Sequence, residues 1–207
     1  MTTALFPWLY DVIMRAAERG RFSRWRHSVV RSAWGRTLEI GAGTGLNFSH
    51  YRAGGTVIAT EPDLGMLARA RDRARVPDAV ILLAAANAEA LPFRAATFDT
   101  AVVGLALCTI PRPELALAEL RRVLRSGGSL HLIEHVRVAN PVAGRLQDWL
   151  TPLWRRVAGG CRLNRRTVEA VAASGFVLEE VRPHAGGLVV EIDARAPEDA
   201  AGHVSAD

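Results

Sequence analysis

The stretch RTLEIGAGTGLN, residues 36–47, decides how the rest of this chain folds. Its first half, Thr37–Ile40, is short, apolar and partly β-branched, which is typical of a strand buried on both faces of a parallel sheet. The second half carries glycine at every other position, Gly41, Gly43 and Gly45. Glycines so spaced allow left-handed backbone conformations and close approach of a ligand. The stretch therefore predicts a strand followed by a loop that binds a nucleotide-sized cofactor.

Acidic residues near this loop indicate which cofactor it binds. Glu39 lies two residues before the first glycine, where a carboxylate would repel a pyrophosphate but attract an ammonium group. S-adenosylmethionine carries an ammonium and a sulfonium and has no phosphate. About twenty residues further on, Glu61 ends a second apolar run, at a position where a carboxylate can accept both ribose hydroxyls. The two acids together favour S-adenosylmethionine over a nicotinamide dinucleotide.

Four motifs in order resemble those of class I S-adenosylmethionine-dependent methyltransferases. They are LEIGAGTG at residues 38–45, the acid Glu61, the pair AEALPF and FD at residues 88–93 and 98–99, and LRRVLRSGG at residues 120–128. The resemblance implies a set of cofactor-binding residues: Glu39, Gly41, Ala42, Gly43, Gly45, Asn47, Glu61, Pro62, Asn87, Ala88, Glu89 and Leu105. Asn87 stands where the family usually has an acid that touches the adenine amino group. An asparagine oxygen can still accept that hydrogen bond without charge assistance.

Alternating strand and helix patterns predict an α/β fold of the Rossmann-like class I methyltransferase type. We expect a mostly parallel seven-stranded sheet with helices on both faces and a C-terminal antiparallel hairpin. The expected strands are residues 37–40, 58–61, 80–84, 100–105, 129–134, 176–182 and 188–192. The expected helices are residues 4–19, 23–33, 46–51, 62–74, 113–124, 140–158 and 167–174, and the pair Gly127-Gly128 is expected to stop the helix at residues 113–124. Residues 1–35 are expected to form lid helices, residues 36–195 the methyltransferase domain and residues 196–207 a flexible tail.

Composition and charge limit the class of protein. The chain has 207 residues and is 49% hydrophobic, which suits one domain with a full core. Its formal net charge is +5 and its pI is about 10.4. Basic groups near tryptophans at residues 15–36 and 155–166 suit contact with an anionic membrane surface, but we favour solvated helix faces. Residues 105–110 lack the polar row of base N-methyltransferases, so a nucleic-acid partner is not expected.

The C-terminal third narrows the resemblance to the branch that holds thiol S-methyltransferase-like proteins. The motifs are EHV at residues 134–136, QDWLTPLW at 147–154, GCRLNR at 160–165 and Pro183-His184. The helix at residues 140–158 places Trp149, Leu150, Leu153, Trp154 and Val157 on one stripe. We expect most of this stripe in the core, with Trp149, Trp154 and His184 as candidates for the acceptor pocket.

His135 is the candidate catalytic residue. It follows a strand at the edge where the cofactor is expected, and a histidine there can take a proton near neutral pH. A histidine bonded to its own loop is an equally good interpretation. Cys108 is interpreted as a small buried hydrophobe rather than a nucleophile, and no metal site is expected. With Cys161 the chain has two cysteines, too few for a disulfide framework, and it opens without a secretory-type segment. We therefore expect a cytoplasmic protein.

The predicted function is methyl transfer from S-adenosylmethionine to a small, apolar acceptor, by preference a thiol. Phosphatidylethanolamine N-methylation or quinone C-methylation at a membrane surface is the alternative within enzymes. A domain that binds the cofactor without catalysis is the alternative outside them. The acceptor and the oligomeric state are not fixed by the residues.

Overall fold

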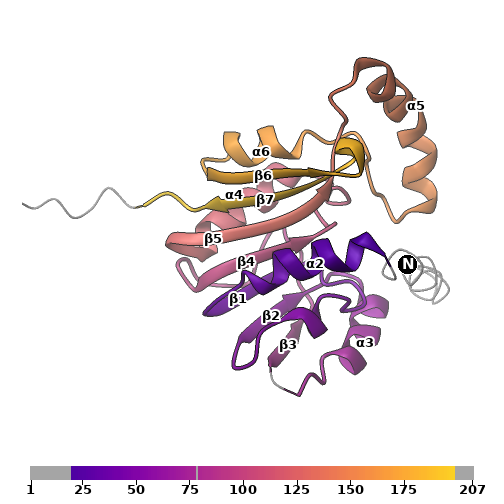
Figure 1. The fold of residues 1–207 in the computed structure, drawn as a ribbon. Coiled ribbons are helices and arrows are strands. Elements are labelled where there is room, and N and C mark those ends of the chain that lie inside the picture. The colour runs from indigo at the N-terminus through magenta and orange to yellow at the C-terminus, as the bar shows by residue number, and fades with distance from the viewer. Residues whose placement is uncertain (1–19, 78, 199–207) are drawn as a thin grey trace, which may run out of the picture.

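The computed structural model describes residues 20–77 and 79–198, and in this part of the chain one seven-stranded sheet forms the centre of the molecule (Figure 1). Its strands are β1 (Arg36–Ile40), β2 (Thr56–Thr60), β3 (Val80–Ala84), β4 (Phe98–Gly104), β5 (Leu124–His135), β6 (Val177–His184) and β7 (Val189–Arg195). Strands β1 to β5 are parallel, and β7 pairs antiparallel with both β5 and β6. The predicted fold class is confirmed.

The strand order β3-β2-β1-β4-β5-β7-β6 places the glycine loop at the centre of one sheet edge. The chain moves outward from β1 through β2 to β3 and then returns to build β4 on the other side of β1. Ligands of open α/β sheets bind at such a switch point, beyond the carboxyl ends of the strands. The loops that follow β1 and β4 therefore meet where a cofactor would bind.

Helices cover both faces of the sheet because its strands alternate their side chains between two cores. On β4, Ala101 and Val103 join the core cluster that includes residues of α4 (Pro113–Val123) and α6 (Thr167–Ala173). Val102 between them joins the second cluster, which includes residues of α2 (Arg21–Arg31) and α3 (Leu64–Arg73). Two short 3-10 helices lie in loops between strands: η1 (Phe48–His50) between β1 and β2, and η2 (Ala185–Gly187) between β6 and β7.

Two predicted boundaries are wrong for local reasons. The helix expected at residues 46–51 is only the 3-10 helix η1, since turns occupy residues 43–47. The stop expected at Gly127-Gly128 lies inside β5, because α4 leads directly into that strand at Leu124. The pairing register jumps there from Phe98↔Leu124 to Thr100↔Ser129, so the glycines lie in an irregularity of the sheet.

Helix α5 (Pro141–Val157) stands apart from the sheet (Figure 1). Trp149 is 75% exposed and Leu153 is 61% exposed, and Leu150 and Trp154 are also exposed. The expected burial of this stripe is therefore wrong for these four residues; the side chain of Val157 lies outside the described set. The polar face is the one that contacts the body: Gln147 is buried and bonds the backbone of Val136, Val138 and Leu163. Periodicity reveals two faces of a helix but not which of them meets the protein.

The predicted lid helix at residues 4–19 and most of the predicted tail lie outside the described residues. In the described part of the predicted tail, Ala196 is buried and its amide donates to the Gly128 carbonyl at 2.8 Å. Of the predicted N-terminal pair of helices, α2 is described, and its Val29 and Val30 are buried against the sheet.

None of the described helices combines the length and hydropathy that a membrane span requires.

Candidate functional site

The glycine loop after β1 leaves open space beside the sheet edge. Gly41 has φ +66°, and a Cβ there would meet the Ala106 Cβ at 2.4 Å, so this glycine lets the β1 and β4 loops touch. Gly43 has φ +56°, and no described atom lies within 4 Å of the position that its Cβ would take. Ala42 is buried and Gly45 packs against the Phe48 ring, so they shape the loop from behind. The Gly43 backbone is therefore uncovered on this side of the loop.

Glu61 lies opposite this loop at the end of β2. One carboxylate oxygen accepts from the Gly43 amide at 3.0 Å and the other from the Asp63 amide at 2.9 Å. Burial raises the pKa of this carboxyl, while the two amides act in the opposite direction. Each oxygen keeps a lone pair for a further donor. The predicted ribose contact is therefore sterically and chemically available.

A cavity of about 530 Å³ joins these groups to the β3 and β4 loops. Predicted site residues among its lining are Gly41, Gly43, Glu61, Pro62, Asn87 and Ala88. Its other walls include Asp63, Met66, Ala106, Thr109 and Ile110, together with residues at the end of α5 and just after it, Arg155, Arg156, Ala158, Gly159 and Gly160. The volume and the uncovered Gly43 backbone fit an adenosine-sized ligand.

Glu39 lies inside the protein rather than on this cavity. Its oxygens accept from Asn47 Nδ2 at 2.7 Å and the Tyr51 hydroxyl at 2.8 Å. Asn47 in turn accepts from Arg26 at 2.7 Å. Burial raises the pKa of Glu39 to about 7, against the effect of these partners. Glu39 and Asn47, both predicted to meet the ligand, therefore hold the loop in shape and do not line the cavity.

Two other predicted contacts are also engaged elsewhere. Glu89 accepts from the Arg112 backbone amide at 3.0 Å and from its Nε at 2.9 Å and Nη2 at 2.7 Å, and these hydrogen bonds, the backbone one most of all, lower the pKa of Glu89. Leu105 directly follows β4; its amide donates to the Ile133 carbonyl at 2.8 Å, and its φ of +58° is a conformation that costs a side-chain-bearing residue energy. Asn87 does line the cavity, but its Oδ1 accepts the Glu89 amide at 3.0 Å.

Glu134 holds the β4 loop from the end of β5. This fully buried carboxylate accepts from the amides of Ala106 at 2.7 Å, Leu107 at 2.8 Å and Cys108 at 3.0 Å. Burial raises its pKa to about 7, although the three amides oppose that shift. Glu134 thus anchors one wall of the cavity, a role that its sequence motif did not indicate.

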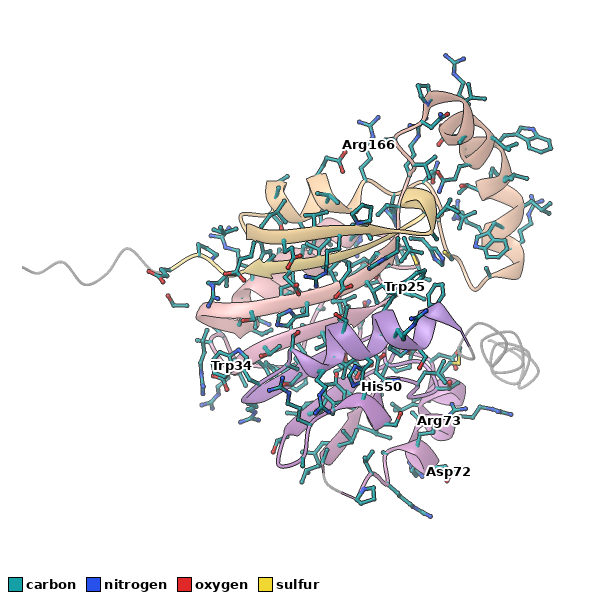
Figure 2. The ribbon with its side chains drawn as sticks, viewed as in Figure 1. Trp25, Trp34, His50, Asp72, Arg73 and Arg166 are labelled. Atoms are coloured by element: carbon teal, nitrogen blue, oxygen red, sulfur yellow. The ribbon has the colours of Figure 1, made fainter. Side chains whose placement is uncertain are left out.

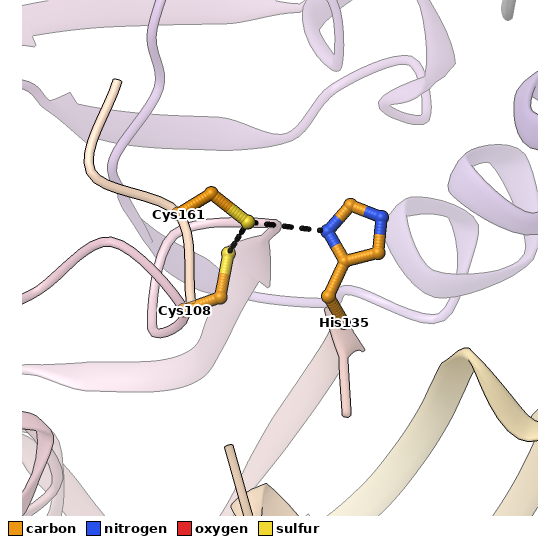
Figure 3. A group of neighbouring side chains, drawn as sticks. All are labelled: Cys108, His135 and Cys161. Carbon is orange, nitrogen blue, oxygen red and sulfur yellow. Dashed lines mark hydrogen bonds between the residues drawn. The ribbon is translucent and has the colours of Figure 1, made fainter. Parts of the chain in front are cut away.

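His135, the candidate catalytic residue, lies beside both cysteines (Figure 3). The Cys161 Sγ is 3.6 Å from His135 Nδ1 and 3.4 Å from Cys108 Sγ. Cys108 is buried, as predicted, but its partners were not foreseen. The three residues are far apart in sequence. Cys108 follows β4 and His135 ends β5, which pair side by side, but Cys161 lies between α5 and α6, where no strand end could have indicated the contact.

The two thiols differ in their pKa values. The hydrogen bond from Cys108, opposed by burial and assisted by His135, lowers the pKa of Cys161 to about 5. The same hydrogen bond, with burial, raises the pKa of Cys108 well above its usual value. Burial acts to lower the pKa of His135, but the Cys161 contact and Glu134 raise it overall. Cys161 is therefore the more acidic thiol.

The three predicted acceptor residues do not form one pocket. His184 stacks on Trp25 of α2 at 4.6 Å between ring centroids, and its Nε2 is 3.0 Å from a Glu191 oxygen. Trp25 points from α2 toward the β6–β7 hairpin (Figure 2). Phe22 of the same helix lies 5.1 Å from Trp25 and 6.4 Å from His135 between ring centroids. Trp149 is exposed on α5, whereas Trp154 is one of the neighbours that lower the pKa of Cys161.

Known proteins share both the sequence and the fold of this chain. Residues 38–132 match a family model described as a methyltransferase domain. Human thiol S-methyltransferase TMT1B is 30% identical over 175 residues, which cover 78% of this chain and 71% of that protein. Demethylmenaquinone methyltransferase of Renibacterium salmoninarum is 37% identical over 130 residues, covering 60% and 53%. The crystal structure of a SAM-dependent methyltransferase from Thermotoga maritima has the same fold, with a TM-score of 0.67, 22% identity, and coverage of 92% and 97%.

We predict that Glu61→Ala weakens S-adenosylmethionine binding at least about 100-fold, because two hydrogen bonds to a charged acceptor are lost, each worth about 1.5–3 kcal/mol. Isothermal titration measures the effect. Glu179→Ala, which removes an exposed carboxylate of β6 that pairs with Arg195 of β7, is the matched control and should bind like the parent. Equal affinities in both variants would contradict the assignment of Glu61.

We predict that Glu39→Gln flattens the pH dependence of stability. The folded protein keeps the Glu39 proton up to about pH 7, while the unfolded chain releases it near 4.5. The contribution of Glu39 to the unfolding free energy is thus full below pH 4.5 and falls as pH rises to 7, by about 1.4 kcal/mol per pKa unit. Urea unfolding of parent and variant at pH 5, 6, 7 and 8 measures the difference. Parallel curves would show that Glu39 is not buried as a neutral acid.

Proposed function

This chain belongs to the class I S-adenosylmethionine-dependent methyltransferases, and from that premise we propose that it transfers the methyl group to the sulfur of a small, apolar thiol. The observation that carries the proposal is the surroundings of His135. The Phe22 ring lies 6.4 Å from the ring of this histidine between centroids, and the Cys161 Sγ lies 3.6 Å from its Nδ1. An aromatic ring and a thiol beside the histidine suit a soft, apolar acceptor better than an amine. The name of the human relative supports the same acceptor class.

The cofactor supplies a methyl group on a sulfonium, which is already a good leaving group. The protein therefore has to hold the acceptor behind the methyl and exclude water, an alignment worth up to about 7–11 kcal/mol. Glu61 and the Gly43 backbone would hold the adenosine half. Asn87, Ala88 and Pro62 would wall the base and ribose. The remaining predicted loop residues, Glu39 and Asn47 among them, keep that geometry fixed.

The acceptor must lose its proton, since a thiolate and not a thiol is the nucleophile. We propose His135 as the residue that assists this loss. It extends from the last parallel strand, and the neighbouring Glu134 fixes the loop opposite. His184, stacked on Trp25, and Trp154, close to Cys161, would then flank the acceptor from two sides.

We predict that a primary alkyl thiol of low polarity, such as benzyl mercaptan, yields S-adenosylhomocysteine and the methyl thioether. His135→Gln should lower kcat/KM about 100-fold at pH 7, within the usual range for proton-transfer catalysis. The difference in kcat/KM between parent and variant should become smaller as pH approaches the pKa of the free thiol, because the acceptor is then already ionised in solution. His27→Gln, an exposed histidine on α2, is the control.

A matched panel of amines, phenols and thiols decides the acceptor class. Turnover confined to amines or phenols would contradict a thiol acceptor. Cofactor binding without turnover on any member would support a non-catalytic binding protein instead.

A second candidate function is methylation of a quinone ring or a phospholipid amine at a membrane surface. It is favoured by the exposed apolar face of α5, where Val142, Leu146, Trp149 and Leu153 are all more than half exposed. Arg145, Arg155 and Arg156 on the same helix would meet anionic head groups. The quinone-methylating relative supports this candidate in name. We place the protein in the cytoplasm in either case, since both cysteines are free.

We predict that this second function requires co-sedimentation with phosphatidylserine vesicles that decreases at high salt. The double variant Trp149→Ser/Leu153→Ser should then reduce the bound fraction several-fold, because two large apolar side chains no longer enter the interface. Val80→Ser, which removes an exposed apolar side chain from β3, should leave binding unchanged. Full recovery of the parent in the supernatant at low salt would exclude a membrane-surface reaction.

A further inference from the structure

Three side chains with metal-binding chemistry meet at the carboxyl edge of the sheet (Figure 3). Cys108 comes from the loop after β4, His135 from the end of β5, and Cys161 from the segment between α5 and α6. Their ligand atoms all lie within 4.8 Å of one another. The Cys161 Sγ lies 3.4 Å from the Cys108 Sγ and 3.6 Å from His135 Nδ1.

Two of these separations are close to the edges of a tetrahedral zinc site, and the third, between Cys108 and His135, is at most 4.8 Å. With Zn–S near 2.3 Å and Zn–N near 2.0–2.1 Å, ideal tetrahedral angles give S···S of about 3.8 Å and S···N of about 3.6 Å. A disulfide, in contrast, requires sulfur atoms about 2.05 Å apart. We propose that Cys108, His135 and Cys161 bind a zinc ion through two sulfurs and Nδ1, leaving its fourth position for an exogenous ligand.

The backbone around the cluster is held in place without a metal. The Cys108 amide donates to Glu134 at 3.0 Å, so the residue before His135 also fixes the loop that carries Cys108. The Arg162 amide donates to the Cys108 carbonyl at 2.9 Å and thereby ties the Cys161 segment to the same loop. Ligand positions held by such secondary contacts are typical of metal sites.

The zinc site adjoins the cofactor cavity. Thr109 and Gly160, each next in sequence to one of the two cysteines, both line that cavity. Three protein ligands and one free position are the arrangement of catalytic rather than structural zinc sites. This part of the inference rests on the proposed function: the fourth ligand is the acceptor thiol.

As a zinc ligand, His135 would assist deprotonation of the acceptor through the metal rather than by accepting the proton itself. The thiol loses its proton to solvent as its sulfur binds zinc, and a lone pair of that sulfur forms the bond to the methyl carbon. The bond between that carbon and the cofactor sulfonium breaks, and its electron pair stays on the cofactor sulfur. The neutral thioether is a poorer zinc ligand than the thiolate, so the product can leave.

Cobalt(II) titration of untagged, reduced and chelator-treated protein tests the site in the absence of cofactor and acceptor. The chain has only two cysteines, so a thiolate-to-cobalt charge-transfer band in the near ultraviolet reports Cys108 and Cys161. We expect one cobalt per chain and loss of the band when equimolar zinc is added. Cys108→Ser or Cys161→Ser should greatly weaken the band, and His135→Gln should lower cobalt affinity at least about tenfold.

His27→Gln, which replaces an exposed histidine, is the matched control and should bind cobalt like the parent. Circular dichroism of each variant separates loss of metal from loss of fold. The proposal is overturned if the reduced parent gives no charge-transfer band. It is also overturned if thiol counting and mass measurement show that the two cysteines form a disulfide in the freshly isolated protein.

Addition of benzyl mercaptan to the cobalt protein tests the fourth position separately. A shift of the visible cobalt bands, absent with benzyl alcohol, is expected if the thiol binds the metal. An unchanged spectrum would overturn the acceptor role while the metal site stands. Failure of the proposed thiol methylation would leave the cobalt titration unaffected, so the two conclusions fail independently.

Discussion

The buried carboxylate of Glu134 is the interaction on which the site depends. It ends the last parallel strand and accepts three consecutive backbone amides, from Ala106 to Cys108. Without such an acceptor the amides would lie buried and unpaired, which costs about 1–3 kcal/mol each. The contact fixes the loop after β4, which forms one wall of the cofactor cavity and carries Cys108. The next residue along β5 is His135, so one carboxylate positions two groups at once.

A second buried carboxylate, Glu39, does the same for the glycine loop. It pairs with Asn47 and Tyr51, which follow that loop, and so closes the loop on the strand from which it starts. Both acids lie inside the protein and both have a pKa raised to about 7 by burial. The cofactor cavity is lined by glycine backbone, by Glu61 and Asp63, and by larger side chains such as Met66 and Arg155. Two buried acids thus hold the loops that shape the cavity, and Glu61 is an acid at its wall.

Chemical character changes along the carboxyl edge of the sheet. The β1 and β2 ends present glycine backbone and a carboxylate, which suit the polar half of a nucleoside. The β5 end presents imidazole and two sulfurs, with the rings of Phe22 and Trp25 beyond them. Helix α5 leads from this end into solvent with its apolar face uncovered. A polar cofactor and an apolar acceptor would accordingly approach from different ends of one edge.

Sequence and tertiary structure determined different parts of this protein. Strand periodicity, the glycine spacing and the distance to Glu61 are local features, so the sheet, the cofactor loop and the Gly43–Glu61 pair were predictable from residues alone. The predicted helix stop at Gly127 was wrong because a glycine pair serves equally in a helix stop and in a strand irregularity. The predicted burial of the apolar face of α5 was wrong because amphipathicity does not say which face of a helix contacts the protein. The role of Glu39 and the Cys108–His135–Cys161 cluster depended on packing, since partners distant in sequence carry no periodic signal and meet only when strand order brings their loops together.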